Sequence, residues 1–205
     1  MNKKAIIVIF LSSLFSLTAA QSKSENMEIA TFGGGCFWCT EAIFKELKGV
    51  VSVTSGYSGG DVVNPSYKEI CTGRTGHAEA IEIEFDNSVI SFTELLEVFF
   101  ATHDPTTLNR QGADVGTQYR SVIFYHNPSQ KEVAELVINQ LNTDHVFGKP
   151  VVTEVSAWKN FFRAENYHQD YFENNPAQSY CQFVIVPKVD KFRKIFKDKL
   201  KSTVK

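Results

Sequence analysis

Two cysteines separated by two aromatic residues follow a run of glycines near the start of the chain, in the sequence GGGCFWC at residues 33–39. A helical pattern starts at the first of them, Cys36, and extends to about Leu47. A cysteine at a helix N-terminus lies near free backbone N–H groups and the positive end of the helix dipole, and both favour the thiolate. The glycines would let a substrate approach closely. Cys36 is therefore predicted to be a nucleophile, and a buried structural cysteine is the alternative.

Phe37 and Trp38 place two large rings directly after this candidate nucleophile. Adjacent rings could form the wall of a pocket for a small apolar group such as a methyl. The same rings could instead belong to the hydrophobic core, because aromatic residues at the start of a helix are commonly buried.

Glu79 is the second residue that could carry chemistry. It belongs to an alternating pattern over residues 77–85 that places Ile81, Ile83 and Phe85 on one face of a strand, and the same parity puts Glu79 on that apolar face. Burial would raise its pKa above the usual value of about 4.3 and allow it to donate a proton near neutral pH. The alternative is a glutamate at a strand edge that reaches solvent.

The other cysteines do not complete a metal site. Cys71 is isolated and Cys181 lies far along the chain. A structural zinc site would require a second closely spaced pair of cysteines or histidines, and the chain has none. A thioredoxin-like domain would require small residues or proline between Cys36 and Cys39, whereas this chain has Phe37 and Trp38 there. A zinc site is therefore not expected.

The first twenty residues resemble a secretory signal peptide rather than part of a fold. Lys3 and Lys4 precede an uncharged apolar run over residues 5–17, and small residues follow it. We expect cleavage near Gln21 and export to the periplasm or the exterior, without stable membrane association. An uncleaved anchor is the alternative, although the apolar run is short for a membrane span.

Residues 21–205 are predicted to form a single domain. The chain of 205 residues is 43% hydrophobic, which is enough for one substantial core. Its formal charge of −2 indicates no binding to nucleic acid. Strands and helices alternate without a strict βαβ rhythm, which favours a two-layer α+β domain with a mixed sheet. Strands are predicted at 27–32, 50–54, 77–85, 118–126, 151–155 and 183–186, and helices at 36–47, 91–102, 128–141, 161–173 and from Lys188 onward.

Four motifs, taken together, resemble the A-type peptide methionine sulfoxide reductases. They are Gly-Cys-Phe-Trp at 35–38, Asn-Pro-Ser-Tyr at 64–67, Thr-Gly-His-Ala-Glu at 75–79 and Gly-Thr-Gln-Tyr-Arg at 116–120. The resemblance extends from about Glu28 to Lys188. It implies a ferredoxin-like α/β core and the reduction of the S epimer of methionine sulfoxide, free or in oxidised proteins, without a metal or prosthetic group.

The resemblance also implies roles for residues that are unremarkable singly. By position, Cys36 matches the nucleophile and Glu79 the acid. The remaining matches are Phe37 and Trp38 around the substrate methyl, Tyr67 and Tyr119 on the sulfoxide oxygen, and Asp114 and His168 as supporting polar residues. These roles agree with the chemistry, because a sulfoxide sulfur is a poor electrophile until its oxygen is protonated or strongly hydrogen-bonded.

Attack on the sulfoxide leaves the nucleophile as a sulfenic acid, which a second thiol must convert to a disulfide. Members of the family often carry two recycling cysteines in a glycine-rich tail, and this chain has only Cys181 at the first of those positions. Cys181 is the candidate that the resemblance favours. Cys39 is the alternative, because a spacing of three residues on a helix places it near Cys36, and Cys71 is expected to be structural. A thioredoxin-like exported protein, or dithiothreitol in the test tube, would then reduce the disulfide.

Two other classes of function compete with this hypothesis. Cys36 and Cys39 could exchange disulfides with protein substrates in a thiol–disulfide oxidoreductase. Alternatively, the pair could be structural in a secreted binding module that has no enzymatic activity.

Overall fold

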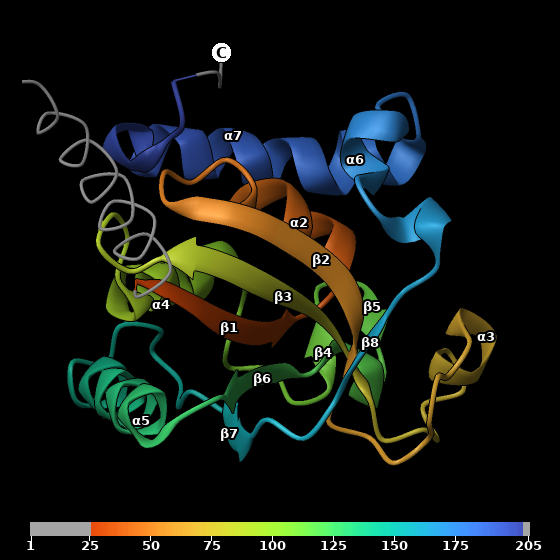
Figure 1. Ribbon diagram of the computed structural model, residues 1–205, viewed down its shortest axis with the longest axis horizontal. Helices are drawn as coiled ribbons and strands as arrows, with labels where there is room; N and C mark the ends of the chain where they lie inside the picture. Colours follow the sequence, from red (N-terminus) through yellow and green to blue (C-terminus); the bar gives the residue numbers. More distant parts are fainter. Residues whose placement is uncertain (1–25, 203–205) are drawn as a thin grey trace, which may run out of the picture.

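The computed structural model describes residues 26–202, so the predicted signal peptide at 1–20 lies outside the described residues. Six strands form one sheet in the order β7-β6-β1-β3-β2-β8 (Figure 1). The strands are β1 (Met27–Gly34), β2 (Val50–Ser58), β3 (Ala78–Asp86), β6 (Ser121–Tyr125), β7 (Glu154–Ala157) and β8 (Phe161–Arg163). Only β6 and β7 pair in parallel, so the sheet is mixed, as predicted.

The centre of the sheet has the connectivity of a ferredoxin-like core. The chain runs through β1, helix α2 (Phe37–Phe44), β2, β3, helix α4 (Phe92–Thr102) and β6, and the four strands lie antiparallel in the order β6-β1-β3-β2. This is the βαββαβ arrangement of that fold. The predicted two-layer α+β class is confirmed.

Helices cover one face of this sheet. Helices α2 and α4 pack against the sheet, α5 (Pro128–Thr143) lies beside α4, and α7 (Val186–Ile195) covers both α2 and α4 (Figure 1). The core between the layers is aromatic: the fully buried ring of Phe32 lies 5.8, 5.8 and 5.0 Å from the rings of Phe44, Phe92 and Phe99. Helix α4 begins where the sequence predicted, with a capping box in which Ser91 and Glu94 bond each other's backbone N–H groups.

Short elements make up the rest of the described chain. They are α3 (Tyr67–Ile70), the hairpin of β4 (Arg110–Gln111) and β5 (Asp114–Val115), the 3-10 turns η1 (Thr117–Tyr119), η2 (Asn166–His168) and η4 (Lys197–Lys199), α6 (Tyr171–Asn174), and the π-helix η3 (Cys181–Ile185). Within residues 26–202, none of the helices is both long and apolar enough to cross a membrane.

The helix predicted over residues 161–173 is wrong. Residues 161–163 form the edge strand β8, which pairs with β2, and the backbone then turns through η2 and reaches α6 only after Asp170, whose φ is 54°. The backbone of β2 supplies partners that a helix would otherwise provide internally, because Ala164 N–H donates to Ser55 O at 2.9 Å. Tertiary pairing therefore overrides the local helical pattern.

The strand predicted over residues 183–186 is also wrong. Residues 183–185 belong to η3, which continues directly into α7 at Val186. Its buried side chains recur with helical spacing at Cys181, Ile185, Val189 and Phe192, whereas Phe183 is 81% exposed. Smaller differences occur where β6 begins three residues after the predicted strand start, following η1, and where β7 lies later than the predicted 151–155.

Candidate active site

Cys36 occupies the sharp junction between β1 and α2. It is the N-cap of the helix, with φ −58° and ψ 120°, and is 8% exposed. Gly35 before it has φ +89°, and a Cβ there would lie 2.5 Å from Cγ of Gln111; a Cβ on Gly33 would lie 2.8 Å from Cγ1 of Val122. The glycines therefore allow the protein to pack tightly behind Cys36, rather than leaving the open approach for substrate that the sequence suggested.

Glu79 on β3 faces this junction from inside the protein. The side chain is 1% exposed, and Oε2 accepts a hydrogen bond of 3.1 Å from the backbone N–H of Phe37. Burial raises the pKa of Glu79 to about 8, in spite of that hydrogen bond, and the charges of Asp114 and Cys39 add to the increase. The predicted burial on the apolar face is confirmed. A protonated carboxylic acid thus lies beside the thiol at neutral pH.

The two thiols at the start of α2 contact each other. Burial raises the pKa of Cys36 well above its ordinary value, and the hydrogen bond and charge of Cys39 and the charge of Glu79 raise it further. The pKa of Cys39 is lowered, chiefly by its hydrogen bond with Cys36 and against the effect of burial. The predicted stabilisation of a Cys36 thiolate by the helix N-terminus does not prevail, since the N–H of Phe37 bonds to Glu79 instead.

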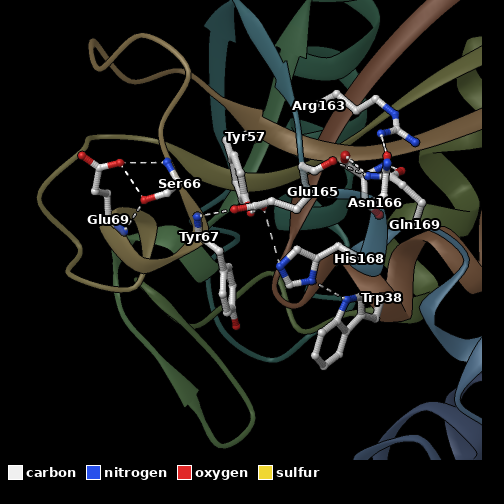
Figure 2. A network of polar contacts seen from close by, with 12 residues as sticks. Trp38, Tyr57, Ser66, Tyr67, Glu69, Arg163, Glu165, Asn166, His168 and Gln169 are labelled. Atoms are coloured by element: carbon white, nitrogen blue, oxygen red, sulfur yellow. Dashed lines mark hydrogen bonds and ion pairs between the residues drawn. The ribbon is translucent and has the colours of Figure 1, made fainter.

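Trp38 is held at the front of the site by two aromatic partners. Its indole stacks on Tyr171, with ring centroids 3.6 Å apart and an interplanar angle of 6°. Its Nε1–H donates to Nδ1 of His168 at 3.1 Å (Figure 2). Phe37 is buried behind it, with its ring 5.0 Å from that of His168 and 5.9 Å from that of Tyr57. Trp38 is half-buried and is therefore the ring of the pair that retains an exposed surface.

A network of polar contacts connects Trp38 to the tyrosines of the site (Figure 2). Because Nδ1 of His168 accepts from Trp38, the neutral imidazole carries its proton on Nε2, which lies 3.9 Å from Oε2 of Glu165. Burial lowers the pKa of His168, which favours this neutral form. Glu165 also accepts hydrogen bonds of 2.8 Å from the Tyr57 hydroxyl and from the backbone N–H of Tyr67. These bonds outweigh burial and hold the pKa of Glu165 below its ordinary value.

Tyr67 and Tyr119 supply two phenols from different elements. Tyr67 opens α3 and its ring meets the edge of His168, with centroids 4.4 Å apart, while Tyr119 ends η1. Burial raises the pKa of both phenols, and the negative charge that Glu79 can carry raises them further. Both therefore stay protonated. Together with Glu79 they form a set of hydrogen-bond donors suited to an oxygen atom on a substrate attacked by Cys36.

Tyr180 is a functional candidate that sequence reasoning missed. Its hydroxyl donates to Oδ2 of Asp114 at 2.8 Å, it hydrogen-bonds to Cys36 and Cys39, and its ring meets Trp38 edge-on with centroids 5.8 Å apart. The one sequence feature that could have pointed to Tyr180 is its position next to Cys181. The other residues missed were Tyr57, Glu165 and Tyr171, for which the sequence offered no distinctive pattern.

Cys181 is buried on the side of α2 that η3 covers. It is fully buried, and burial raises its pKa, with the charge of Cys39 adding to the effect. Cys71, at the C-cap of α3, is exposed. In the part of the chain that the structure describes, no three His, Cys, Asp or Glu side chains are grouped so that they could hold a metal ion.

Comparison with known proteins assigns this chain to a family. The family model for peptide methionine sulfoxide reductase matches residues 28–200. The peptide methionine sulfoxide reductase MsrA of Saccharolobus solfataricus is 57% identical over 85% of this chain and 98% of its own length. The enzyme of the same name from Deinococcus radiodurans is 56% identical over 93% of each chain.

Solved structures agree with these relatives. Methionine sulfoxide reductase A of Corynebacterium diphtheriae matches with a TM-score of 0.71 and 35% identity, over 75% of this chain and 77% of that one. Reduced Mxr1 from Saccharomyces cerevisiae matches with a TM-score of 0.70 and 36% identity, over 77% and 90%. Mxr1 in complex with Trx2 matches less closely, with a TM-score of 0.50 and 25% identity over 72% and 86%. The chain belongs to the peptide methionine sulfoxide reductase family, of the MsrA type, and is a thiol-dependent oxidoreductase.

Proposed function

We propose that this enzyme reduces the S epimer of methionine sulfoxide, both in oxidised proteins and as the free amino acid, with Cys36 as the nucleophile. The observation that carries the proposal is the meeting of two groups at the start of α2. There a buried cysteine at the N-cap lies beside a glutamic acid whose pKa of about 8 keeps it protonated at neutral pH.

In the proposed reaction, Glu79, Tyr67 and Tyr119 donate hydrogen bonds to the sulfoxide oxygen. Protonation of that oxygen by Glu79 makes the sulfur electrophilic. The Cys36 thiolate attacks the sulfur and forms an S–S bond, while the S–O bond breaks and the protonated oxygen leaves as water. Water then attacks the Cys36 sulfur, the S–S bond breaks, methionine is released, and Cys36 remains as a sulfenic acid. Methionine sulfoxide is reduced by two electrons and Cys36 is oxidised by two.

The high pKa of Cys36 in the free enzyme affects the first step of this reaction. Attack requires the thiolate, while activation of the sulfoxide requires the protonated acid. Transfer of the Cys36 proton to Glu79, as Glu79 gives its own proton to the substrate oxygen, would satisfy both requirements. The thiolate is then formed where the substrate accepts the proton, so no thiolate has to be maintained in the buried site beforehand.

Selectivity for one epimer follows because the hydrogen-bond donors and the indole of Trp38 lie on different elements around Cys36. The acid and the phenols lie on β3, α3 and η1, whereas the indole of Trp38 is fixed by Tyr171 and His168. A sulfoxide with its oxygen on the donors and its methyl against Trp38 presents its sulfur to Cys36 in only one configuration. The opposite epimer would exchange the oxygen and the methyl.

A thioredoxin-like protein is the proposed reductant, because Mxr1 of the same family has been solved in complex with Trx2. The N-terminal segment supports export of the enzyme, so this reductant would operate outside the cytosol. The chemistry uses thiols and hydrogen-bond donors from the chain itself. Repair of oxidised proteins in the exported compartment is the biological role that we propose.

The test is turnover of the separate S and R epimers of a methionine sulfoxide peptide, with dithiothreitol as the reductant. We expect activity on the S epimer alone. Cys36→Ser should abolish it, while Lys131→Ala, which removes an exposed ion pair on α5, should leave it intact. Equal turnover of both epimers would disprove the selectivity, and full activity of Cys36→Ser would disprove the assignment of the nucleophile.

A further inference from the structure

We infer that Glu41 on α2 is a positioning residue for the indole of Trp38, because it fixes the start of α6 and with it the stacked ring of Tyr171. The inference rests on the proposed function, in which this indole receives the methyl group of the substrate. It assigns a role in the site to the second turn of α2, one turn beyond the N-cap at Cys36.

Helix α6 has no cap of its own. It consists of four residues, and its N-cap residue Asp170 makes no side-chain hydrogen bond to the helix. The Asp170 side chain bonds to Nζ of Lys45 instead. The first N–H groups of a helix have no partner within the helix, and so short a helix is not stable alone. The start of α6 therefore depends on an acceptor from another element.

Glu41 provides that acceptor from α2. Its Oε1 accepts a hydrogen bond of 3.1 Å from the backbone N–H of Asp170, and the N–H of Tyr171 also bonds to the carboxylate. The side chain is only 2% exposed. Burial raises the pKa of Glu41 to about 7, whereas these two hydrogen bonds act in the opposite direction. A buried carboxylate is stable only where such donors are fixed, so Glu41 and the start of α6 hold each other in one geometry.

Lys45 makes a second, weaker connection between the two helices. It lies four residues after Glu41 and thus on the same face of α2. Its Nζ bonds to Asp170 and, at 3.1 Å, to Oε1 of Glu173. All three side chains are partly exposed, and ion pairs of this kind contribute little to stability. The hydrogen bonds to the buried Glu41 are therefore expected to determine the position of α6.

Tyr171 transmits this position to Trp38. It is the first residue of α6, and its backbone N–H bonds to Glu41 while its ring stacks on the indole with centroids 3.6 Å apart. A shift of the backbone at Tyr171 would therefore displace the ring that supports the indole.

The other support of Trp38 is fixed independently of Glu41. The indole N–H donates to His168, which lies in η2 (Figure 2). Gln169 follows His168, and its side chain accepts from the N–H of Ser55 at 3.0 Å and donates to the carbonyl of Ser55 at 2.9 Å, on β2. Loss of Glu41 should therefore release Tyr171 while His168 stays in place.

A double-mutant cycle tests the inference. Glu41→Ala, Tyr171→Leu and the double variant would be compared with the wild type, and Glu41→Gln would keep the volume of the side chain and one acceptor oxygen. Each protein would also carry Trp158→Phe, so that Trp38 is its only tryptophan. The readouts are KM, the single-turnover rate at saturation with S-methionine sulfoxide peptide, and the fluorescence emission of Trp38.

We expect Glu41→Ala to raise KM roughly two- to tenfold, as is expected for Tyr171→Leu, with the rate at saturation unchanged. Glu41→Gln should show a smaller rise, because the amide keeps one acceptor. The emission of Trp38 should shift to longer wavelength in these variants, since the indole gains contact with water. The double variant should have the same KM as Tyr171→Leu, because Glu41 acts through Tyr171.

Glu46→Ala is the matched control. This carboxylate, two residues after the end of α2, bonds to Arg193 of α7 instead of to α6. Its loss should lower stability without changing KM or the emission of Trp38. An equal rise of KM in Glu46→Ala would overturn the inference, because the effect would then belong to α2 as a whole.

Increases in KM that multiply in the double variant would also overturn the inference, and so would unchanged KM and emission in Glu41→Ala. If Glu41→Ala does not fold, the cycle with Glu41→Gln is judged by the same outcomes. Failure of the proposed function gives a different result. In that case the wild-type protein would release no methionine, while the emission of Trp38 would still shift in the Glu41 variants.

Discussion

The two halves of the site are built in different ways. Cys36 and Glu79 come from the regular centre of the fold, at the β1–α2 junction and on β3, and both are nearly or fully buried. Residues 161–185 contribute His168, Tyr171, Tyr180 and Cys181 from an edge strand, a 3-10 turn, a four-residue helix, a π-helix and the segments that connect them. This second half holds Trp38 and carries Cys181.

The first half of the site carries the groups of the chemical step, whereas the second half supports Trp38 and carries a cysteine for recycling. The sheet and α2 fix the nucleophile and the acid in one geometry, since β3 pairs along both of its edges. Residues 161–185 pack against this region from the outside of the fold. Short elements of this kind open more easily than a paired central strand. Changes in the first half should therefore reduce the rate of the chemical step, whereas changes in the second half should act mainly on substrate binding, stability and recycling.

The largest effect is expected from removal of the acid. Glu79→Ala should lower the single-turnover rate of methionine formation about 10²- to 10⁴-fold, because no donor replaces the carboxylic acid. Glu79→Gln keeps an N–H donor and the shape of the side chain, and should lose about tenfold or less. Rapid-quench measurement of methionine release compares the two. Equal losses would show that Glu79 acts through structure rather than as a donor.

The same pair of proteins gives a pH test of the acid. The acid form of Glu79 is present below its pKa of about 8 and is lost as the pH rises through that value. Ionisation of Cys36 raises the rate with pH in both proteins, so the informative quantity is the ratio of the two rates. The ratio of Glu79→Gln to wild type should rise above about pH 8. A constant ratio from pH 6 to 10 would contradict the raised pKa.

An intermediate effect is expected at the connection between the two halves. Glu165→Ala removes the acceptor for the Tyr57 hydroxyl and for the N–H of Tyr67, and leaves the first of these groups buried. We expect a loss of about 2 to 4 kcal/mol in the free energy of unfolding, together with a higher KM, as measured by urea denaturation and steady-state kinetics. The control is Glu173→Ala, which removes an exposed ion pair with Lys45 and should cost less than about 1 kcal/mol. Equal destabilisation by the two variants would refute the bridging role of Glu165.

The smallest effect is expected from the loss of the stacking contact between Tyr171 and Trp38. Tyr171→Leu removes the stacked ring beneath the indole, an interaction of about 0.5 to 1.5 kcal/mol. We expect KM to rise roughly two- to tenfold with the single-turnover rate at saturation unchanged. The same replacement at Tyr125, on β6, is the control. A large drop in the rate at saturation would mean that Trp38 takes part in the chemical step.

The sequence predicted the first half of the site far better than the second. Strand parity put Glu79 on the apolar face, with an edge position that reaches solvent as the alternative, and the helix predicted from residue 91 agrees with the start of α4, because both signals depend on neighbouring residues only. The ferredoxin-like core came from the family resemblance and is confirmed by the topology. In contrast, β8 exists only because β2 offers it a partner from more than a hundred residues earlier in the chain.

Within the site, the burial of individual side chains could not be predicted from the local sequence patterns. The position of Cys36 at a helix N-terminus suggested a low pKa, but the surrounding core and the neighbouring acid reverse the direction. Tyr180 could not be recognised because its partner Asp114 lies on a hairpin far away in the sequence. The proposed roles of Tyr67, Tyr119 and His168 rest on the resemblance, on the charge of Glu79 that raises the pKa of both phenols, and on the hydrogen bond from Trp38 to His168.

The hydrogen bond from Phe37 N–H to Glu79 has a consequence for the moment at which the acid gives up its proton. The carboxylate left behind would be an unfavourable buried charge, but the positive end of α2 already points at it. That bond strengthens as the negative charge appears, because a charge-assisted hydrogen bond is about twice as strong as a neutral one. The first turn of α2 therefore carries the nucleophile and also stabilises the Glu79 carboxylate that forms when the proton is transferred.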